Sequence, residues 1–470
     1  MKDKYLVACL CCACMVVALQ QTLVIPLLPD LPRLLDTSVA GASWLVTATL
    51  LTGAVSTPVL TRLADMVGKR RIALVCLAAV AGGGVMGALS VSLSSAVIAR
   101  AVAGVGIPLI PISIAILEEE LPDERSPARV ALLSSTLAVG SAVGMVLPGI
   151  VAQVVHWRLI FLICGVAALV MIAGVVRVVP RREGRAPGRF DLVGAVILTV
   201  ALVALLLLFT QAETWGWTSG PVISLAIGSV LATVLWIVLQ LRVRDPLVDI
   251  RTLARPVLLL TNAGSLLVGF AMFMNLLATS QLLQLPDSTG AGLGMDAVRA
   301  GLWMTPIALS FGLLALLSSH ITRRFGARTT LVAGALLMSA AYVGRISLGA
   351  GLWQIILASV AVSVGSAFAY AAFPVIVTRA VPSWQTSSAN GLNNLLRSIG
   401  TTISSAVMAV LLTTTITRSG AGAAQQAFTY VFLIGALVAF VAFLVTLPLI
   451  WLPDFPPRTV ESHTGLAGRP

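Results

Sequence analysis

The stretch Thr61-Arg62-Leu63-Ala64-Asp65-Met66-Val67-Gly68-Lys69-Arg70-Arg71 separates two apolar segments that are each long enough to cross a membrane. Charged side chains are costly in lipid and are tolerated at its edge, so this basic stretch is predicted to be a turn at a membrane surface. A weaker copy follows much later, Ser319-His320-Ile321-Thr322-Arg323-Arg324-Phe325-Gly326-Ala327-Arg328. One such turn in each half predicts a duplicated helical membrane protein, and duplicated membrane bundles are typically transporters.

The composition of the chain agrees with burial in lipid. Of its 470 residues, 58% are hydrophobic and 10% are charged, whereas a soluble domain carries roughly 25% charged residues. The formal net charge of +12 lies in short clusters between apolar segments, which argues against nucleic acid as a partner. All six cysteines lie in apolar segments, where a thiol acts as a small apolar side chain, so neither a metal site nor a disulfide is predicted.

Apolar segments of about 20 residues predict membrane-spanning helices. We count fourteen of them, at residues 5–28, 42–61, 72–92, 95–117, 129–153, 158–178, 190–210, 220–241, 256–284, 298–318, 329–349, 352–378, 394–416 and 427–452. The count becomes twelve if residues 190–241 lie flat on the membrane. Lys and Arg concentrate in alternate loops, which predicts a multi-pass protein of the inner or plasma membrane with both termini in the cytoplasm.

The two halves match each other at an offset of about 258–260 residues. Gly68 corresponds to Gly326, and Gly140 corresponds to Gly400. Features that recur in the same order indicate parallel repeats. Because the offset covers eight predicted helices, we expect a six-helix bundle at 1–182, a two-helix insert at 183–250, a second six-helix bundle at 251–455 and a cytoplasmic tail at 456–470.

These features resemble the major facilitator superfamily, and within it the fourteen-helix drug/proton antiporters. The resemblance implies an all-α membrane protein with the major facilitator fold, in which two six-helix bundles and a two-helix insert give 14 transmembrane helices. The first basic turn is similar to the family's Gly-x-Leu-Ala-Asp-x-x-Gly-Arg-Arg/Lys signature, with Thr61 in place of the opening Gly.

The signature implies a gate at the cytoplasmic end, made by Asp65, Gly68, Arg70, Arg71 and Gly326. Asp65 is suited to receive backbone donors at a neighbouring helix N-terminus. The glycine permits a tight turn, and the two arginines are suited to pair with acids or lipid phosphates. The alternative interpretation is a simple topology anchor.

The fourth predicted helix carries Ile98-Ala99-Arg100-Ala101-Val102-Ala103-Gly104-Val105-Gly106, which resembles the family's buried-arginine motif. The resemblance ties Arg100 to proton coupling, because an arginine within lipid normally faces a cavity or a partner. Arg100 lies near the outer end of its helix, so the alternative is that its side chain snorkels to the interface.

The fifth predicted helix carries Gly140, Gly144, Pro148 and Gly149, a pattern that resembles the signature of antiporters and drug exporters, with Met145 and Pro148 departing from it. This motif favours export over uptake. Close helix packing through small residues is the alternative.

Titratable groups are scarce inside the predicted helices. Gln20 stands where related exporters carry an Asp, and an amide can hydrogen-bond a substrate but cannot carry a proton. No Asp or Glu lies well inside a predicted span. No cofactor is predicted, and the proton gradient as energy source comes from the resemblance.

Polar residues inside apolar helices are expected to line a central cavity between the bundles. The candidates are Gln20, Gln21, Asn262, Asn275, Gln281, Tyr370, Asn390, Asn394 and Arg397. For each amide, a hydrogen bond between helices is the alternative. The lack of a buried acid argues against a strongly cationic substrate.

We therefore interpret the chain as a secondary transporter, surrounded by membrane lipid and monomeric, that exports hydrophobic or amphipathic drug-like small molecules by alternating access in exchange for protons. The alternatives are a dedicated exporter of an endogenous metabolite and an uncoupled facilitator. A membrane-embedded enzyme is disfavoured because its three histidines, His156, His320 and His463, are far apart in the sequence.

Overall fold

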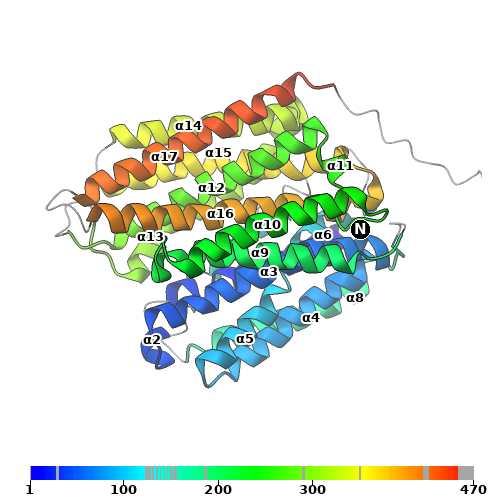
Figure 1. Cartoon of the computed structure of the whole chain (residues 1–470), viewed down its shortest axis with the longest axis horizontal. Helices are drawn as coiled ribbons and strands as arrows, with labels where there is room; N and C mark the ends of the chain where they lie inside the picture. Colours follow the sequence, from blue (N-terminus) through cyan, green and yellow to red (C-terminus); the bar gives the residue numbers. More distant parts are fainter. Residues whose placement is uncertain are drawn as a thin grey trace, which may run out of the picture.

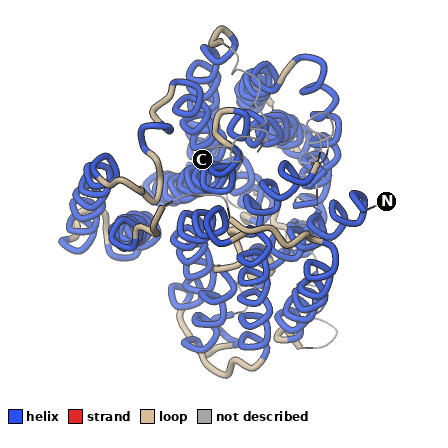
Figure 2. The backbone as a smooth tube through the Cα atoms, turned by 90° about the vertical axis from the view of Figure 1, so that its right-hand side faces the viewer, coloured by secondary structure: helices blue, strands red, loops and turns tan. Residues whose placement is uncertain are grey.

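A computed structural model describes residues 2–27, 31–121, 156–184, 188–287, 292–348, 351–416 and 423–453, with individual positions between 129 and 151. The regular structure in these residues is helical throughout (Figures 1 and 2). The long helices are α1 (Lys2–Thr22), α3 (Val39–Val67), α4 (Lys69–Ala88), α5 (Leu93–Gly104), α6 (Leu109–Glu120), α8 (Leu159–Val178), α9 (Leu192–Trp215), α10 (Gly220–Arg242), α12 (Pro256–Gln284), α13 (Ala297–Phe325), α14 (Ala327–Ser347), α15 (Leu352–Arg379), α16 (Thr386–Ile416) and α17 (Ala423–Thr446). Short helical turns are η1 (Ile25–Leu27), α2 (Leu31–Leu34), α11 (Ile250–Leu253), η3 (Ser383–Gln385) and η4 (Leu447–Ile450).

The helices form two lobes that lie side by side with their axes along the long dimension of the molecule (Figure 1). The first lobe contains α1–α6 and α8, and the second contains α12–α17. Each lobe buries its own apolar core, centred on residues such as Leu77 and Ile112 in the first and Met338 and Phe373 in the second. Burial of apolar surface within each lobe holds its helices together.

Twelve helices of the described part of the chain are long and apolar enough to span a membrane. The predicted count of fourteen is not confirmed. The predicted span 129–153 lies partly outside the described residues, and the predicted span 298–318 falls in α13, a 29-residue helix that is not among the twelve. The two segments at 190–241 form α9 and α10, which run alongside the other long helices (Figure 1).

The two basic turns adopt the same backbone conformation. Gly68 ends α3 and precedes α4 with φ 117°, and Gly326 ends α13 and precedes α14 with φ 87°. Positive φ is strained for residues with a Cβ, so glycine permits both sharp reversals. We call the end of the molecule that carries these turns the Gly68 end.

The fourth predicted span is a broken helix rather than a continuous one. Between α5 and α6 the backbone bonds tighten to three-residue steps, as in Ile107 N–H to Gly104 C=O at 3.1 Å. Pro108 has no N–H to donate and cannot continue the α-helical ladder. The break lets α5 and α6 pack in different directions against their neighbours.

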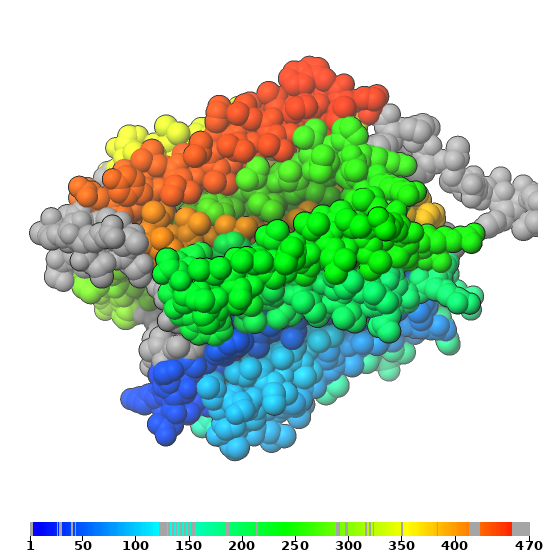
Figure 3. Space-filling view, viewed as in Figure 1, coloured from blue at the N-terminus to red at the C-terminus, as the bar shows by residue number. Residues whose placement is uncertain are grey.

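Helices α9 and α10 form the two-helix insert, which covers the boundary between the lobes on one face of the molecule (Figure 3). Helix α9 packs against α3 of the first lobe and α16 of the second. Leu198 and Leu202 of α9 share one apolar cluster with Ala54 of α3 and Leu395 of α16.

A polar contact fixes the base of this insert. The Gln240 amide donates to Asp191 Oδ2 at 2.6 Å and accepts from Val248 N–H at 3.2 Å, which ties α9, α10 and the following linker together.

Candidate functional site at the boundary of the two lobes

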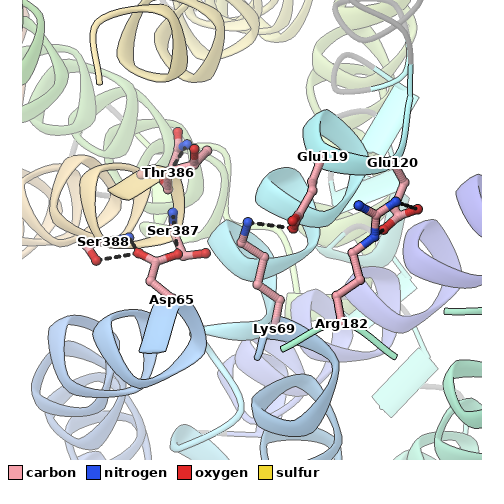
Figure 4. A network of polar contacts seen from close by, with 9 residues as sticks. Asp65, Lys69, Glu119, Glu120, Arg182, Thr386, Ser387 and Ser388 are labelled. Atoms are coloured by element: carbon pink, nitrogen blue, oxygen red, sulfur yellow. Dashed lines mark hydrogen bonds and ion pairs between the residues drawn. The ribbon is translucent and has the colours of Figure 1, made fainter. Parts of the chain in front are cut away.

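Asp65, in the last turn of α3, joins the first lobe to the second. Its carboxylate accepts hydrogen bonds from Ser387 N–H at 3.3 Å, Ser388 N–H at 2.9 Å and the Ser388 hydroxyl at 2.5 Å (Figure 4). Both backbone donors lie in the first turn of α16, where unpaired N–H groups and the helix dipole favour an anion. The side chain is only 2% exposed, so these bonds are shielded from water.

Two ion pairs flank Asp65 within the first lobe. Lys69 Nζ lies 2.8 Å from Glu119 Oε2, and Arg182 Nε lies 2.5 Å from Glu120 Oε1 (Figure 4). The glutamates come from the last turn of α6, so the pairs connect the start of α4 and the chain after α8 to that turn. The acids of α6 are thereby neutralised at the Gly68 end.

Arg70 and Arg71 contact backbone carbonyls in the part of the chain that the structure describes, and their pairing with acids or lipid phosphates stays a prediction. Arg70 Nη2 donates to Val176 C=O at 2.5 Å, and Arg71 Nη1 lies 3.4 Å from Val67 C=O. Lys69 at the start of α4 and Arg182 after α8 pair with the acids of α6 instead. Arg71 is exposed.

Two small cavities lie next to this contact. One of about 30 Å³ is lined by residues including Asp65, Lys69, Glu119, Arg182 and Trp384, and has room for a water molecule. A second, of about 150 Å³, lies between α3, the linker after α10 and the start of α16, with polar lining from Arg62, Asp245, Asp249, Gln385 and Ser388. The insert's linker therefore reaches the junction of the lobes.

Arg100 is buried inside the first lobe, so the snorkelling alternative is wrong. The side chain is 1% exposed. Its Nη1 donates to Gln20 C=O of α1 at 2.9 Å, and its Nε lies 3.3 Å from Leu45 C=O of α3. Arg100 Nη2 and both amide atoms of Gln20 are buried without a hydrogen-bond partner in the described residues. Arg100 thus ties three helices together through backbone carbonyls.

The glycines of the predicted antiporter motif face α1. A Cβ at Gly140 would lie 2.5 Å from Met15 O, and one at Gly144 would lie 2.7 Å from Leu19 O. Thr22 Oγ1 adds a bond of 3.1 Å to Ser141 C=O. The described part of the motif therefore makes a close helix contact, as its packing interpretation expects. Pro148 is buried, and Gly149 lies outside the described residues.

Gly400 of α16, the predicted repeat partner of Gly140, makes the equivalent contact in the second lobe. A Cβ there would lie 2.1 Å from Leu266 O of α12. The two lobes thus use matching glycines to bring matching helices together.

Three of the predicted cavity amides are used in hydrogen bonds between or within helices. Asn262 Oδ1 accepts from Asn393 Nδ2 at 2.9 Å, Asn275 Nδ2 donates to Ser359 C=O at 3.2 Å, and Asn390 Nδ2 donates to Thr386 C=O at 3.0 Å. All three are buried. Gln21 is partly exposed, and Gln281 is exposed near the end of α12.

The remaining three candidates come together in the second lobe. Arg397 Nη2 donates to Asn394 Oδ1 at 2.5 Å, and the Arg397 guanidinium carbon lies 4.5 Å from the centre of the Tyr370 ring. All three side chains are partly exposed, and they come from α15 and α16.

The sequence interpretation missed the residues that complete the site. Ser387 and Ser388 were not predicted to contact Asp65, although Ser residues that follow Pro382 and η3 are a signal for a helix start. The gating role of Asp65, Gly68, Arg70, Arg71 and Gly326 stays a prediction.

The matched turns and glycines, and the two helical lobes, point to one family of duplicated membrane bundles. Residues 10–283 and 262–467 match the profile described as the Major Facilitator Superfamily. The chain belongs to this superfamily. Members of the Major Facilitator Superfamily are transporters rather than enzymes, and its many apolar helices make this chain a multi-pass membrane protein.

Several curated members of the superfamily are similar in sequence. The uncharacterized transporter EfpA of Mycobacterium tuberculosis is 29% identical over 324 residues, which cover 68% of this chain and 59% of EfpA. The tetracenomycin C resistance and export protein of Streptomyces glaucescens is 27% identical over 409 residues, covering 85% and 74%. The multidrug resistance protein Stp of M. tuberculosis is 27% identical over 390 residues, covering 82% and 71%.

Solved structures of the superfamily share the fold. The human organic anion transporter MFSD10 superposes with a TM-score of 0.67 at 16% identity, covering 94% of this chain and 99% of that chain. The proton:xylose symporter XylE superposes with a TM-score of 0.65 at 12% identity, covering 96% of each chain. At these identities the likeness establishes the major facilitator fold.

Proposed function

We propose that the protein is a fourteen-helix exporter of hydrophobic or amphipathic small molecules that works by alternating access and exchanges its substrate for protons. The observation that carries this proposal is the set of hydrogen bonds from the start of α16 to Asp65, which closes one end of the lobe boundary. A transporter that alternates needs such a contact to form in one state and break in the other.

The direction of transport and the class of substrate are supported by the relatives. Two of the similar proteins are named for tetracenomycin C export and for multidrug resistance. Export of this kind would contribute to antibiotic resistance of the cell.

The helix count of fourteen is supported by α9 and α10, which are candidate spans outside both lobes, and by α13. In this proposal the Gly68 end faces the cytoplasm, because the basic residues at that end follow the positive-inside rule.

The deciding experiment is efflux from proteoliposomes that contain the purified protein and a panel of fluorescent amphipathic compounds. Export should be faster with an imposed proton gradient and should fall when a protonophore collapses it. Export that is unchanged by the protonophore contradicts proton coupling. If no compound of the panel leaves faster than from empty liposomes, the export function itself is wrong.

An uncoupled facilitator is the second candidate, and one specific observation favours it. Gln20 replaces the carboxylate that related exporters carry in the first helix, and the sequences of α12–α17 contain neither Asp nor Glu. A proton coupler requires a group that titrates between access states. The protonophore arm above separates the two candidates, since a facilitator equilibrates its substrate without a gradient.

A further inference from the structure

Arg397, Asn394, Tyr370 and Phe311 form a polar and aromatic group in the second lobe, which we call the Arg397 cluster. The guanidinium carbon of Arg397 lies 4.5 Å from the Tyr370 ring centre, and its Nη2 donates to Asn394 Oδ1 at 2.5 Å. The Tyr370 and Phe311 rings meet edge to face, with centres 5.3 Å apart. A cation, an amide and two rings thus face one another.

The cluster lies where four helices of the second lobe meet. Phe311 comes from α13, Tyr370 from α15 and Arg397 from α16, while Met272 of α12 packs beside the two rings. On α12, a Cβ at Gly269 would lie 2.9 Å from Arg397 Cγ, so the absent side chain leaves room for the arginine stem. Four converging helices place the guanidinium inside the lobe and away from lipid.

Arg397 is also near the middle of a membrane-spanning segment, Thr386–Leu412. An arginine at that depth is strongly disfavoured unless a partner or a water-filled cavity receives it. Arg397 is partly exposed, in contrast to the fully buried Arg100. Its Nε and Nη1 atoms have no hydrogen-bond partner among the described residues and are not fully buried, so they are available to a solute.

Among the described residues of the second lobe, no acidic side chain forms an ion pair with this guanidinium. The sequences of α12–α17 contain neither Asp nor Glu, and the ion pairs among the described residues involve other side chains. Asn394 accepts a hydrogen bond from the guanidinium and the Tyr370 ring stacks against it, but both groups are neutral and do not balance its positive charge. A guanidinium carries five N–H donors in a planar fork that matches a carboxylate, and Asn394 uses only one side of that fork.

We propose that Arg397 binds the carboxylate of an aromatic, amphipathic substrate, with the substrate ring against Tyr370 and Phe311. The proposal rests on the export function above and names its substrate class. Two N–H groups of the guanidinium reach the carboxylate, while the edge-to-face rings extend the aromatic surface. Met272 adapts the apolar wall to rings of different shape.

A purely structural role, in which Arg397 only holds Tyr370 in place, predicts no preference for charge. Arg345 of α14 provides the matched comparison. It also lies over an aromatic ring, with its guanidinium carbon 4.7 Å from the centre of Phe432, but it is 6% exposed and packs against α17, outside the four-helix junction.

The test measures binding of three probes with one ring system, pyrenebutyrate, its methyl ester and pyrenebutyltrimethylammonium. Each is titrated into the purified full-length protein in detergent, and energy transfer from tryptophan to pyrene reports binding, with empty micelles subtracted. The wild type should bind pyrenebutyrate about tenfold more tightly than the ester, from hydrogen bonds to a charged group, and should bind the cation least.

The variants test whether Arg397 causes the preference for the carboxylate probe. Arg397→Gln should bring the ratio of the carboxylate and ester affinities close to one, and Arg397→Lys should keep part of it because the charge remains without the fork. Arg345→Gln should leave the ratio unchanged. Because each ratio is measured within one variant, a general loss of folded protein does not change it.

Three outcomes overturn the proposal: equal affinity of the wild type for the three probes, failure of the wild type to bind pyrenebutyrate, or an undiminished preference in Arg397→Gln. The wild-type titration alone can overturn the proposal, even if a variant does not fold. In the proteoliposome assay, export of compounds without preference for carboxylates rejects this substrate class and leaves the export function standing. If the protein binds carboxylates preferentially but exports no compound, the export function is rejected and the carboxylate site at Arg397 stands.

Discussion

Asp65 of the first lobe and Ser388 of the second are joined by two hydrogen bonds, from the Ser388 backbone N–H at 2.9 Å and from its hydroxyl at 2.5 Å. The two residues are 323 positions apart in the chain. The bonds combine a carboxylate, a helix N-terminus and an environment shielded from water, which together make them stronger than a surface contact. This relationship makes Asp65 the first residue to test.

Asp65→Asn should reduce transport without preventing membrane insertion. The amide oxygen still accepts one hydrogen bond, but the charge that favours the start of α16 is lost. We expect the closed state to weaken by about 1–2 kcal/mol, a factor of about 5–30 in its population. Efflux from proteoliposomes measures the effect.

Asp296→Asn is the control for Asp65→Asn. Asp296 also accepts from a backbone N–H at a helix start, that of Arg299 at 2.8 Å, but it does not join the lobes, so transport should stay near the wild-type rate. Normal transport by a well-expressed Asp65→Asn variant would refute the gate.

The Lys69–Glu119 pair should stabilise the first lobe rather than gate it, because both residues belong to that lobe. The side chains are 12% and 18% exposed, so the pair is partly shielded. Lys69→Ala and Glu119→Gln should each lower the thermal midpoint of the solubilised protein, with a coupling of about 1 kcal/mol in a double-mutant cycle. Strictly additive effects of the two changes would show that the pair contributes no stability of its own.

Arg100→Ala should lose export more severely than Arg100→Lys. The alanine leaves the Gln20 carbonyl without its Arg100 donor, at about 1–3 kcal/mol for a buried group, while the Leu45 carbonyl keeps the Thr49 hydroxyl as a donor. Lysine can replace the bond to Gln20. Export is compared at equal amounts of folded protein, measured by size-exclusion chromatography. Full and equal activity of both variants would show that transport does not depend on this arginine.

Gly400→Ala should destabilise the second lobe, because the new Cβ would lie 2.1 Å from Leu266 O in a contact between α16 and α12. We expect a loss of about 1–3 kcal/mol in folding stability, read as a lower thermal midpoint. Gly344→Ala is the control, since nothing lies within 4 Å of a Cβ there and alanine favours a helix. An equal midpoint for the two variants would contradict the close packing.

The architecture followed from local patterns in the sequence. Apolar length predicted the spans, and the matched glycines Gly68 and Gly326 predicted two equivalent turns, which the structure shows with φ of 117° and 87°. These features are readable because each depends on residues close together in the chain. The break between α5 and α6 was missed, although Pro108 and Pro111 are its local cause.

The partners of the site residues were much harder to predict. Nothing in the sequence near Asp65 indicates that Ser388 completes its contacts, because that pairing is set by how two whole lobes meet. The amides Asn262 and Asn275 have the composition expected of a cavity, yet the packing of α12 against α15 and α16 uses them within the lobe. Polar type alone does not distinguish a residue that binds solutes from one that joins helices.

The packing of α9 on both α3 and α16 has a consequence for the route of compounds dissolved in the bilayer. On that side the insert covers the boundary between the lobes, where Leu198, Ala54 and Leu395 pack together in one apolar cluster. Lateral diffusion from the lipid towards the centre of the protein is blocked there. A hydrophobic compound dissolved in the bilayer therefore cannot enter between α3 and α16 on the side that α9 covers.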